Sequence, residues 1–106
     1  MRLAGRKAFI TGAAKGIGLA VAKAFAAEGA DVALADMTGD SARAEAAAIA
    51  ELTGVKAVGL EVDVANSASL KAAVEEASAA FSGLDTLACM AATLTARQDV
   101  VDLSED

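Results

Sequence analysis

The fold of this chain is decided by the stretch Lys7-Ala8-Phe9-Ile10-Thr11-Gly12-Ala13-Ala14-Lys15-Gly16-Ile17-Gly18. It begins with a short apolar run, which is typical of a strand buried on both faces of a parallel sheet. Its three glycines lack a Cβ atom, so the backbone can turn sharply and lie close to a ligand. The helix that follows points unpaired N–H groups and the positive end of its dipole at the same place. The stretch therefore predicts a strand, a glycine-rich turn and a helix that together suit a pyrophosphate.

Length and composition indicate one small domain. The chain has 106 residues, of which 56% are hydrophobic, and a net charge of −6. That charge argues against nucleic-acid binding, which needs a basic face. One cysteine and no histidine exclude an internal disulfide and histidine-based catalysis, and they leave little basis for a metal site. No apolar run approaches the roughly 18 residues of a membrane span, and no signal peptide is evident, so we expect a cytoplasmic protein without a membrane partner.

Apolar runs alternate with helical patterns along the rest of the chain. Strands are expected at 8–10, 32–35, 57–64 and 86–90. The first helix is expected at 16–28. The second should run from an N-cap at Asp40 or Ser41 to 52, and the third from an N-cap at Asn66 or Ser67 to 81. Glycines at 29, 54 and 83 suit the ends of these helices. The alternation predicts a Rossmann-like α/β fold with a parallel sheet in the order 3-2-1-4. The first two helices would then cover one face and the third helix the other.

The apolar positions of the last two helices identify the side chains expected to anchor them. In the second helix, Ile49 and Leu52 are the only large apolar groups. The third helix has a longer apolar stripe on helical spacing. Its expected members are Leu70, Ala73, Val74, Ala77 and Phe81.

An acid at the end of the second strand supports nucleotide binding. A glycine-rich turn alone is a weak sign of nucleotide binding, because such a turn can simply be a tight connection from a strand to a helix. Here Asp36 follows Gly18 by 18 positions, close to the roughly 20 at which an acid accepts hydrogen bonds from ribose hydroxyls. A carboxylate there would repel a 2′-phosphate, and Met37 is not basic, so NAD is preferred over NADP. Lys15 fits either a phosphate contact or a solvated loop side chain.

The loop from Thr11 to Gly18 resembles the T-G-x-x-x-G-I-G loop of the short-chain dehydrogenase/reductase family. The resemblance extends over the whole chain, through Glu61-Val62-Asp63-Val64, Gly83-Leu84-Asp85-Thr86-Leu87 and Asp102-Leu103-Ser104-Glu105-Asp106. It implies an oxidoreductase that moves hydride between a nicotinamide cofactor and an alcohol or carbonyl, with the pair Asp63 and Val64 at the adenine. From the motifs and the resemblance together, the expected cofactor-binding residues are Gly12, Lys15, Gly16, Ile17, Gly18, Asp36, Met37, Asp63, Val64 and Met90.

The chain departs from the family pattern in two places. Where the family has Asn-Asn-Ala-Gly after the fourth strand, this sequence has Cys89-Met90-Ala91-Ala92, in which only the third position agrees. Met90 would pass the nicotinamide ribose with its backbone, and we interpret Cys89 as a small apolar residue rather than a nucleophile. The family's chemistry uses a Ser, a Tyr and a Lys, and this sequence has no tyrosine. We therefore expect no catalytic residue in the chain and no turnover from it alone.

Complete members of the family that this chain resembles continue the sheet beyond the fourth strand, so we expect the chain to be part of a longer enzyme. We expect a single partial dinucleotide-binding domain over residues 1–106, without the catalytic half. The fourth strand would form an apolar edge, and one sheet face would be only partly covered. Marginal stability and self-association through that edge and face are the expected consequences, and the resemblance implies a homo-oligomer for complete family members.

Two other functions stay open. A non-catalytic module could bind a nucleotide or pair with another chain through the open edge, and cofactor binding without turnover would favour it. A different Rossmann-type site, such as that of a nucleotide-based methyltransferase, is disfavoured by the spacing of the loop, and competition between NAD and S-adenosylmethionine would test it.

Overall fold

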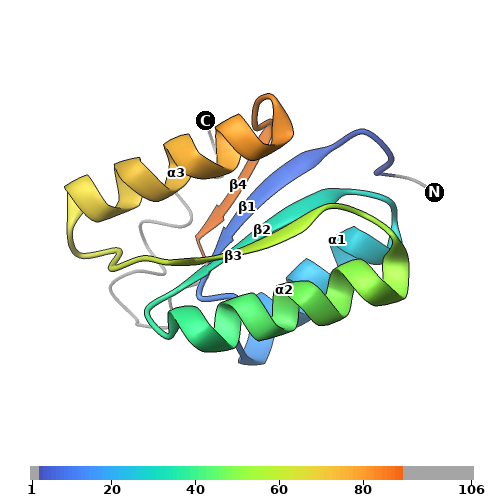
Figure 1. Ribbon diagram of the computed structural model, residues 1–106, viewed down its shortest axis with the longest axis horizontal. Helices are drawn as coiled ribbons and strands as arrows, with labels where there is room; N and C mark the ends of the chain where they lie inside the picture. Colours follow the sequence, from blue (N-terminus) through green and yellow to red (C-terminus); the bar gives the residue numbers. More distant parts are fainter. Residues whose placement is uncertain (1–2, 90–106) are drawn as a thin grey trace.

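The computed structural model describes residues 3–89, and they form a four-stranded sheet with helices on both faces (Figure 1). Along the chain the elements are β1 (Lys7–Thr11), α1 (Gly16–Ala27), β2 (Asp31–Asp36), α2 (Gly39–Thr53), β3 (Ala57–Glu61), α3 (Ser67–Phe81) and β4 (Thr86–Cys89). The strands are parallel and lie in the order β3-β2-β1-β4, which confirms the predicted topology. Within these residues, no helix is long and apolar enough to cross a membrane.

The register of the strands divides their side chains between two apolar clusters. Phe9 of β1 is paired with Ala33 of β2 and Leu87 of β4, while Ile10 is paired with Leu34 and Ala88. Because side chains alternate along a strand, these two rows point to opposite faces of the sheet. Phe9 and Ile10 are both fully buried, which accounts for the continuous apolar run of β1.

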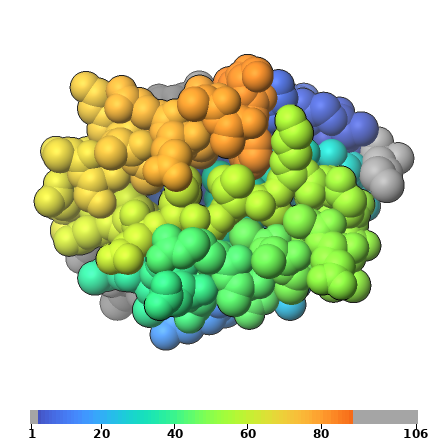
Figure 2. Space-filling model, viewed as in Figure 1, coloured from blue at the N-terminus to red at the C-terminus, as the bar shows by residue number. Residues whose placement is uncertain are grey.

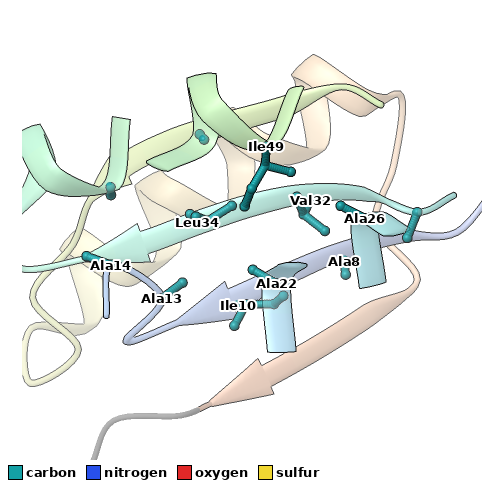
Figure 3. Packing of buried hydrophobic residues seen from close by; sticks show 12 residues of the cluster. Ala8, Ile10, Ala13, Ala14, Ala22, Ala26, Val32, Leu34 and Ile49 are labelled. Carbon is teal, nitrogen blue, oxygen red and sulfur yellow. The ribbon is translucent and has the colours of Figure 1, made fainter. Parts of the chain in front are cut away.

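Helices α1 and α2 cover the face of the sheet to which Ile10 points (Figures 1 and 3). Small side chains, such as Ala22 of α1 and Ala42 of α2, allow both helices to lie close to the strands. Ile49 is buried as predicted, but Leu52 is 83% exposed, so the prediction that Leu52 anchors α2 is wrong. A helix turns about 100° per residue, and the buried stripe through Ala42, Ala46 and Ile49 therefore leaves Leu52 to one side.

Helix α3 covers the opposite face (Figure 1). Figure 2 shows α2 and α3 on either side of β3 in this view of the molecular surface. Ala73, Ala77 and Phe81 are buried against Phe9 and its neighbours, whereas the expected contacts Leu70 and Val74 are only partly buried. Asn66 is the N-cap of α3, and its side-chain oxygen accepts a hydrogen bond from the Ser69 amide at 3.1 Å, as the sequence pattern predicted.

The connection from β2 to α2 and the end of β3 differ from expectation. Helix α2 begins at Gly39 with Thr38 as its N-cap, so the N-cap predicted at Asp40 or Ser41 is wrong. The Thr38 hydroxyl donates to Asp36 instead of capping the helix. Strand β3 stops at Glu61 rather than residue 64, because the chain turns at Asp63. That turn is closed by hydrogen bonds from the Ala65 amide to the Asp63 carboxylate at 3.0 Å and from the Asn66 amide to the Asp63 carbonyl at 2.9 Å.

Candidate dinucleotide-binding site

The glycine-rich loop connects β1 to α1 at the carboxyl edge of the sheet (Figure 1). Gly12 and Gly16 both have φ near 65°, the left-handed region that glycine adopts most easily. A Cβ atom on Gly16 would meet nothing within 4 Å, so this residue borders open space. On Gly18 a Cβ atom would overlap the carbonyl oxygen of Gly12 and lie 2.7 Å from its carbonyl carbon. Gly12 and Gly16 therefore make the turn, while Gly18 lets α1 approach the loop closely.

The first turn of α1 begins without a side-chain cap. Lys15 is its N-cap residue, with extended backbone at φ −162° and ψ 170°, and the first turn contains no acidic residue. The Leu19 amide makes a long bond of 3.4 Å to the Lys15 carbonyl. The first N–H groups of a helix have no intrahelical acceptor, and together with the helix dipole they attract an anion.

Asp36 joins the end of β2 to this loop. Its Oδ2 accepts a hydrogen bond from the Ala14 amide at 3.0 Å, and its Oδ1 accepts from the Thr38 amide at 3.0 Å and the Thr38 hydroxyl at 2.8 Å. Burial alone raises the pKa of Asp36, but these hydrogen bonds, together with the positive charge of Lys15, outweigh it and hold the pKa below its ordinary value of 3.8. The site therefore presents an ionised carboxylate at neutral pH.

A second part of the site lies between the end of β2 and the end of β3. It is an open cleft of about 350 Å³ lined by Met37, Glu61, Val62, Asp63 and Ser69. Its lining is held by hydrogen bonds from the Val62 amide to the Asp36 carbonyl at 2.9 Å and from the Asp63 amide to the Ser69 hydroxyl at 3.1 Å. The volume lies at the lower end of the range for small-molecule sites.

Three of the expected site residues are exposed apolar side chains. Ile17 is 73% exposed, Met37 is 67% exposed and Val64 is 40% exposed. Ile17 lies in the first turn of α1, and Met37 and Val64 lie in the connections that follow β2 and β3, so each of the three comes soon after the carboxyl end of a strand. A flat ring bound at this edge of the sheet would remove apolar surface of this kind from water.

The structure therefore brings most of the predicted residues to one edge. The loop glycines, Lys15 and Asp36 lie together, and Met37 and Asp63 line the same cleft. The predicted contact of Met90 and the segments at 91–92 and 102–106 lie outside the described residues, as does the side chain of Cys89.

The sequence reasoning missed four groups at this edge. They are the Ala14 amide, the Thr38 hydroxyl, Glu61 and Ser69. A usable signal existed for Thr38, because an Asp followed two residues later by a hydroxyl residue is typical of a local side-chain turn. No local signal identifies the Ala14 amide, because its partner is 22 residues away.

A family model described as short chain dehydrogenase matches residues 6–106 of this chain. Among curated proteins, the chain is 42% identical over 86 residues to D-threitol dehydrogenase of Mycolicibacterium smegmatis, covering 81% of this chain and 33% of that protein. It is 49% identical over 87 residues to galactitol 2-dehydrogenase of Agrobacterium fabrum, covering 82% of this chain and 32% of that protein.

A solved structure with the same fold is L-sorbose reductase of Gluconobacter frateurii, complexed with NADPH and L-sorbose. The match has a TM-score of 0.77 and 38% sequence identity, and it covers 83% of this chain and 34% of that one. The chain thus spans about one third of the length of the relatives it matches.

Proposed function

Because this chain belongs to the short-chain dehydrogenase/reductase family, we propose that it supplies the NAD-binding N-terminal part of an oxidoreductase. The whole enzyme would transfer hydride between the nicotinamide and an alcohol or carbonyl. The observation that carries the proposal is the ionised Asp36 carboxylate, hydrogen-bonded to the glycine-rich loop beside the open N-terminus of α1. One edge of the sheet thereby offers acceptors for ribose hydroxyls next to donors for a pyrophosphate.

The proposed pose uses each part of this edge for one part of the cofactor. The pyrophosphate would lie at the first turn of α1, above Gly16, where the structure leaves open space. The adenosine ribose would contact Asp36, and the adenine would enter the cleft between Met37 and Asp63. Lys15 is exposed at the same turn and would reach a phosphate. The nicotinamide end would extend toward β4 and Met90.

The choice of NAD over NADP rests on charge. The L-sorbose reductase structure contains NADPH, so this fold can accommodate NADPH. In this chain the group expected at the ribose is a carboxylate whose pKa is lowered, and its negative charge would repel a 2′-phosphate. Met37, the next residue, offers that phosphate no positive charge. Lys15 is the opposing influence, because its positive charge lies close enough to Asp36 to lower the pKa of that carboxylate.

We further propose that this chain by itself binds cofactor without turnover. The hydride-transfer chemistry of the family uses a tyrosine, and this sequence contains none. The reaction and its substrate would therefore depend on the remainder of the enzyme. The cytoplasmic location expected from the sequence stays a prediction.

The test is calorimetric titration of the 106-residue chain with NAD, NADP and S-adenosylmethionine. We expect NAD to bind more tightly than NADP, and S-adenosylmethionine not to compete. Asp36→Ala should weaken NAD binding about tenfold or more, the effect of losing hydrogen bonds to a charged acceptor. It should also reduce the preference for NAD over NADP, measured as the ratio of their affinities. Gly16→Val should abolish binding of both cofactors by placing a branched side chain where the pyrophosphate lies. If Asp36→Ala left the ratio of the NAD and NADP affinities unchanged, the proposed ribose contact would be wrong.

A pairing module is the second candidate function, and the edge of the sheet favours it. Within residues 3–89, β4 pairs with β1 on one side only, and Leu87 is 48% exposed. An apolar edge strand is prone to pair with another chain, so we propose self-association through β4.

Sedimentation velocity tests this second candidate. We expect Leu87→Lys to shift the population toward monomer. Leu52→Lys is the matched control, because it makes the same chemical change at an exposed leucine on α2. Equal effects of the two variants, or a monomeric wild type, would exclude pairing through β4.

A further inference from the structure

Thr38 occupies the N-cap position of α2 but does not cap it. At an N-cap, a threonine hydroxyl usually accepts a hydrogen bond from an amide of the first turn. Here the Thr38 hydroxyl donates to Oδ1 of Asp36 at 2.8 Å, and the helix has no side-chain cap. The N-cap preference of threonine thus gives way here to a local turn with Asp36, a residue of the proposed site.

The hydrogen bonds to Asp36 use its two oxygens unequally. A carboxylate oxygen can accept about two hydrogen bonds. In the described part of the chain, Oδ1 accepts two, both from Thr38, and Oδ2 accepts one, from the Ala14 amide. One acceptor position is left on Oδ2, the oxygen that faces the glycine-rich loop. A ribose hydroxyl that binds Asp36 would therefore bind through Oδ2.

The same carboxylate secures the loop beside β2. Two successive loop amides bond to the end of that strand, Ala13 to the Ala35 carbonyl at 3.2 Å and Ala14 to Asp36 Oδ2 at 3.0 Å. The first bond joins backbone to backbone and does not depend on any side chain. The second depends on the rotamer of Asp36, which Thr38 holds from the other side. Thr38 thus acts on the loop through Asp36.

We propose that Thr38 is a positioning residue for cofactor selection: it fixes the Asp36 carboxylate so that Oδ2 faces the glycine-rich loop and the ribose 2′-hydroxyl. The inference rests on the proposed NAD function and adds a residue that contacts no cofactor atom itself. Without the hydroxyl, only the Thr38 and Ala14 amides hold the carboxylate, so its orientation toward the loop is less firmly fixed. Recognition of the 2′-hydroxyl then weakens more than binding of the pyrophosphate, which would lie at the first turn of α1.

The experiment compares Thr38→Val, which keeps the shape and removes the hydroxyl, with Thr38→Ser, which keeps the hydroxyl. Thr38 is exposed, so neither substitution disturbs the core. Calorimetry on the 106-residue chain should show that Thr38→Val weakens NAD about fivefold, the order expected when one of several hydrogen bonds to a charged acceptor is lost. The affinity of Thr38→Val for NADP should change less. Thr38→Ser should bind NAD within about twofold of the wild-type affinity. If Thr38→Val lowered the affinities for NAD and NADP by the same factor, the proposal would be overturned, because Thr38 would then have a structural role only.

A second readout does not require cofactor. Carboxyl NMR should show that the titration midpoint of Asp36 rises in Thr38→Val and stays in place in Thr38→Ser. Both variants keep Lys15, the neighbouring positive charge that also lowers the pKa of Asp36. A midpoint that does not move in Thr38→Val would overturn the proposal even if NAD binding weakened. If the wild type bound no NAD while the midpoint moved as expected, the proposed function would fail and the contact between Thr38 and Asp36 would stand.

Discussion

Replacing Gly18 by alanine would place a methyl group against the backbone of the glycine-rich loop. That methyl carbon would overlap the Gly12 carbonyl oxygen and lie 2.7 Å from its carbon and 3.1 Å from the Ala13 Cα. Carbon atoms in contact normally lie about 3.5–4.0 Å apart. The neighbours are backbone atoms, and hydrogen bonds from Ala13 and Ala14 to the end of β2 hold them in place. Either these bonds or the packing of α1 must give way.

Two opposing effects set the size of the change. Alanine is a better helix residue than glycine by about 1 kcal/mol, which alone would stabilise the variant. Overpacking usually costs up to about 3 kcal/mol of stability. We expect a cost near this upper value at Gly18, because the crowded neighbours are backbone atoms, which cannot easily move. We therefore expect the free energy of unfolding to fall by about 2 kcal/mol. At a urea slope of about 2 kcal/mol per molar, the midpoint should fall by about 1 M.

Urea unfolding in dilute solution, followed by circular dichroism, measures this change. Gly16→Ala is the matched control: its methyl group meets no atom within 4 Å, so only the positive φ opposes it. We expect that control to cost about 1 kcal/mol. A Gly18→Ala variant as stable as the wild type, or more stable, would refute the reasoning, because helix propensity would then outweigh the contact with Gly12.

Three further predictions concern stability. Asn66→Ala should cost about 1 kcal/mol in urea unfolding, because the Ser69 amide loses its cap, whereas Asn66→Asp should keep most of that stability. Phe81→Ala should cost about 3 kcal/mol by the same measurement, since it leaves a cavity under the last turn of α3, and a loss below 1 kcal/mol would contradict the burial. The pKa of Asp36 is lowered on folding, so its contribution to stability is complete above its ordinary value of 3.8 and disappears as the pH falls through the folded value. Stability of Asp36→Asn should accordingly fall less steeply than that of the wild type below pH 3.8, and parallel curves would exclude this contribution.

Most of the fold could be predicted because its signals are local. Short apolar runs, helical spacing and glycines at turns each report on a few neighbouring residues, and they placed the seven elements of residues 3–89 close to their observed bounds. The parallel order 3-2-1-4 followed from the alternation of strands and helices, since crossover connections permit few topologies. The loop glycines and Asp36 were found in the same way, by spacing.

Several features depend on contacts that the local sequence pattern does not show. Leu52 is apolar but lies beside the buried stripe of α2, and only the docking of that helix determines which side is buried. Gly59 shows no special local pattern, yet a Cβ atom there would lie 2.5 Å from the Ala42 carbonyl carbon, so it sets how closely α2 packs on β3. Asp40 and Ser41 are good N-caps by type, but α2 begins at Gly39, so Thr38 stands at the N-cap position with its hydroxyl bonded to Asp36.

The sequence by itself determined the parallel sheet, the glycine-rich loop and the acid expected to face a ribose, because periodicity and turn chemistry act over a few residues. Only the tertiary structure decided how the acid is held. The Ala14 amide and Asp36 are 22 residues apart and meet because β1 and β2 are neighbours in the sheet. Their hydrogen bond, together with the two from Thr38, orients this half-buried carboxylate and lowers its pKa. The cleft between Met37 and Asp63 likewise exists only because β2 and β3 end side by side.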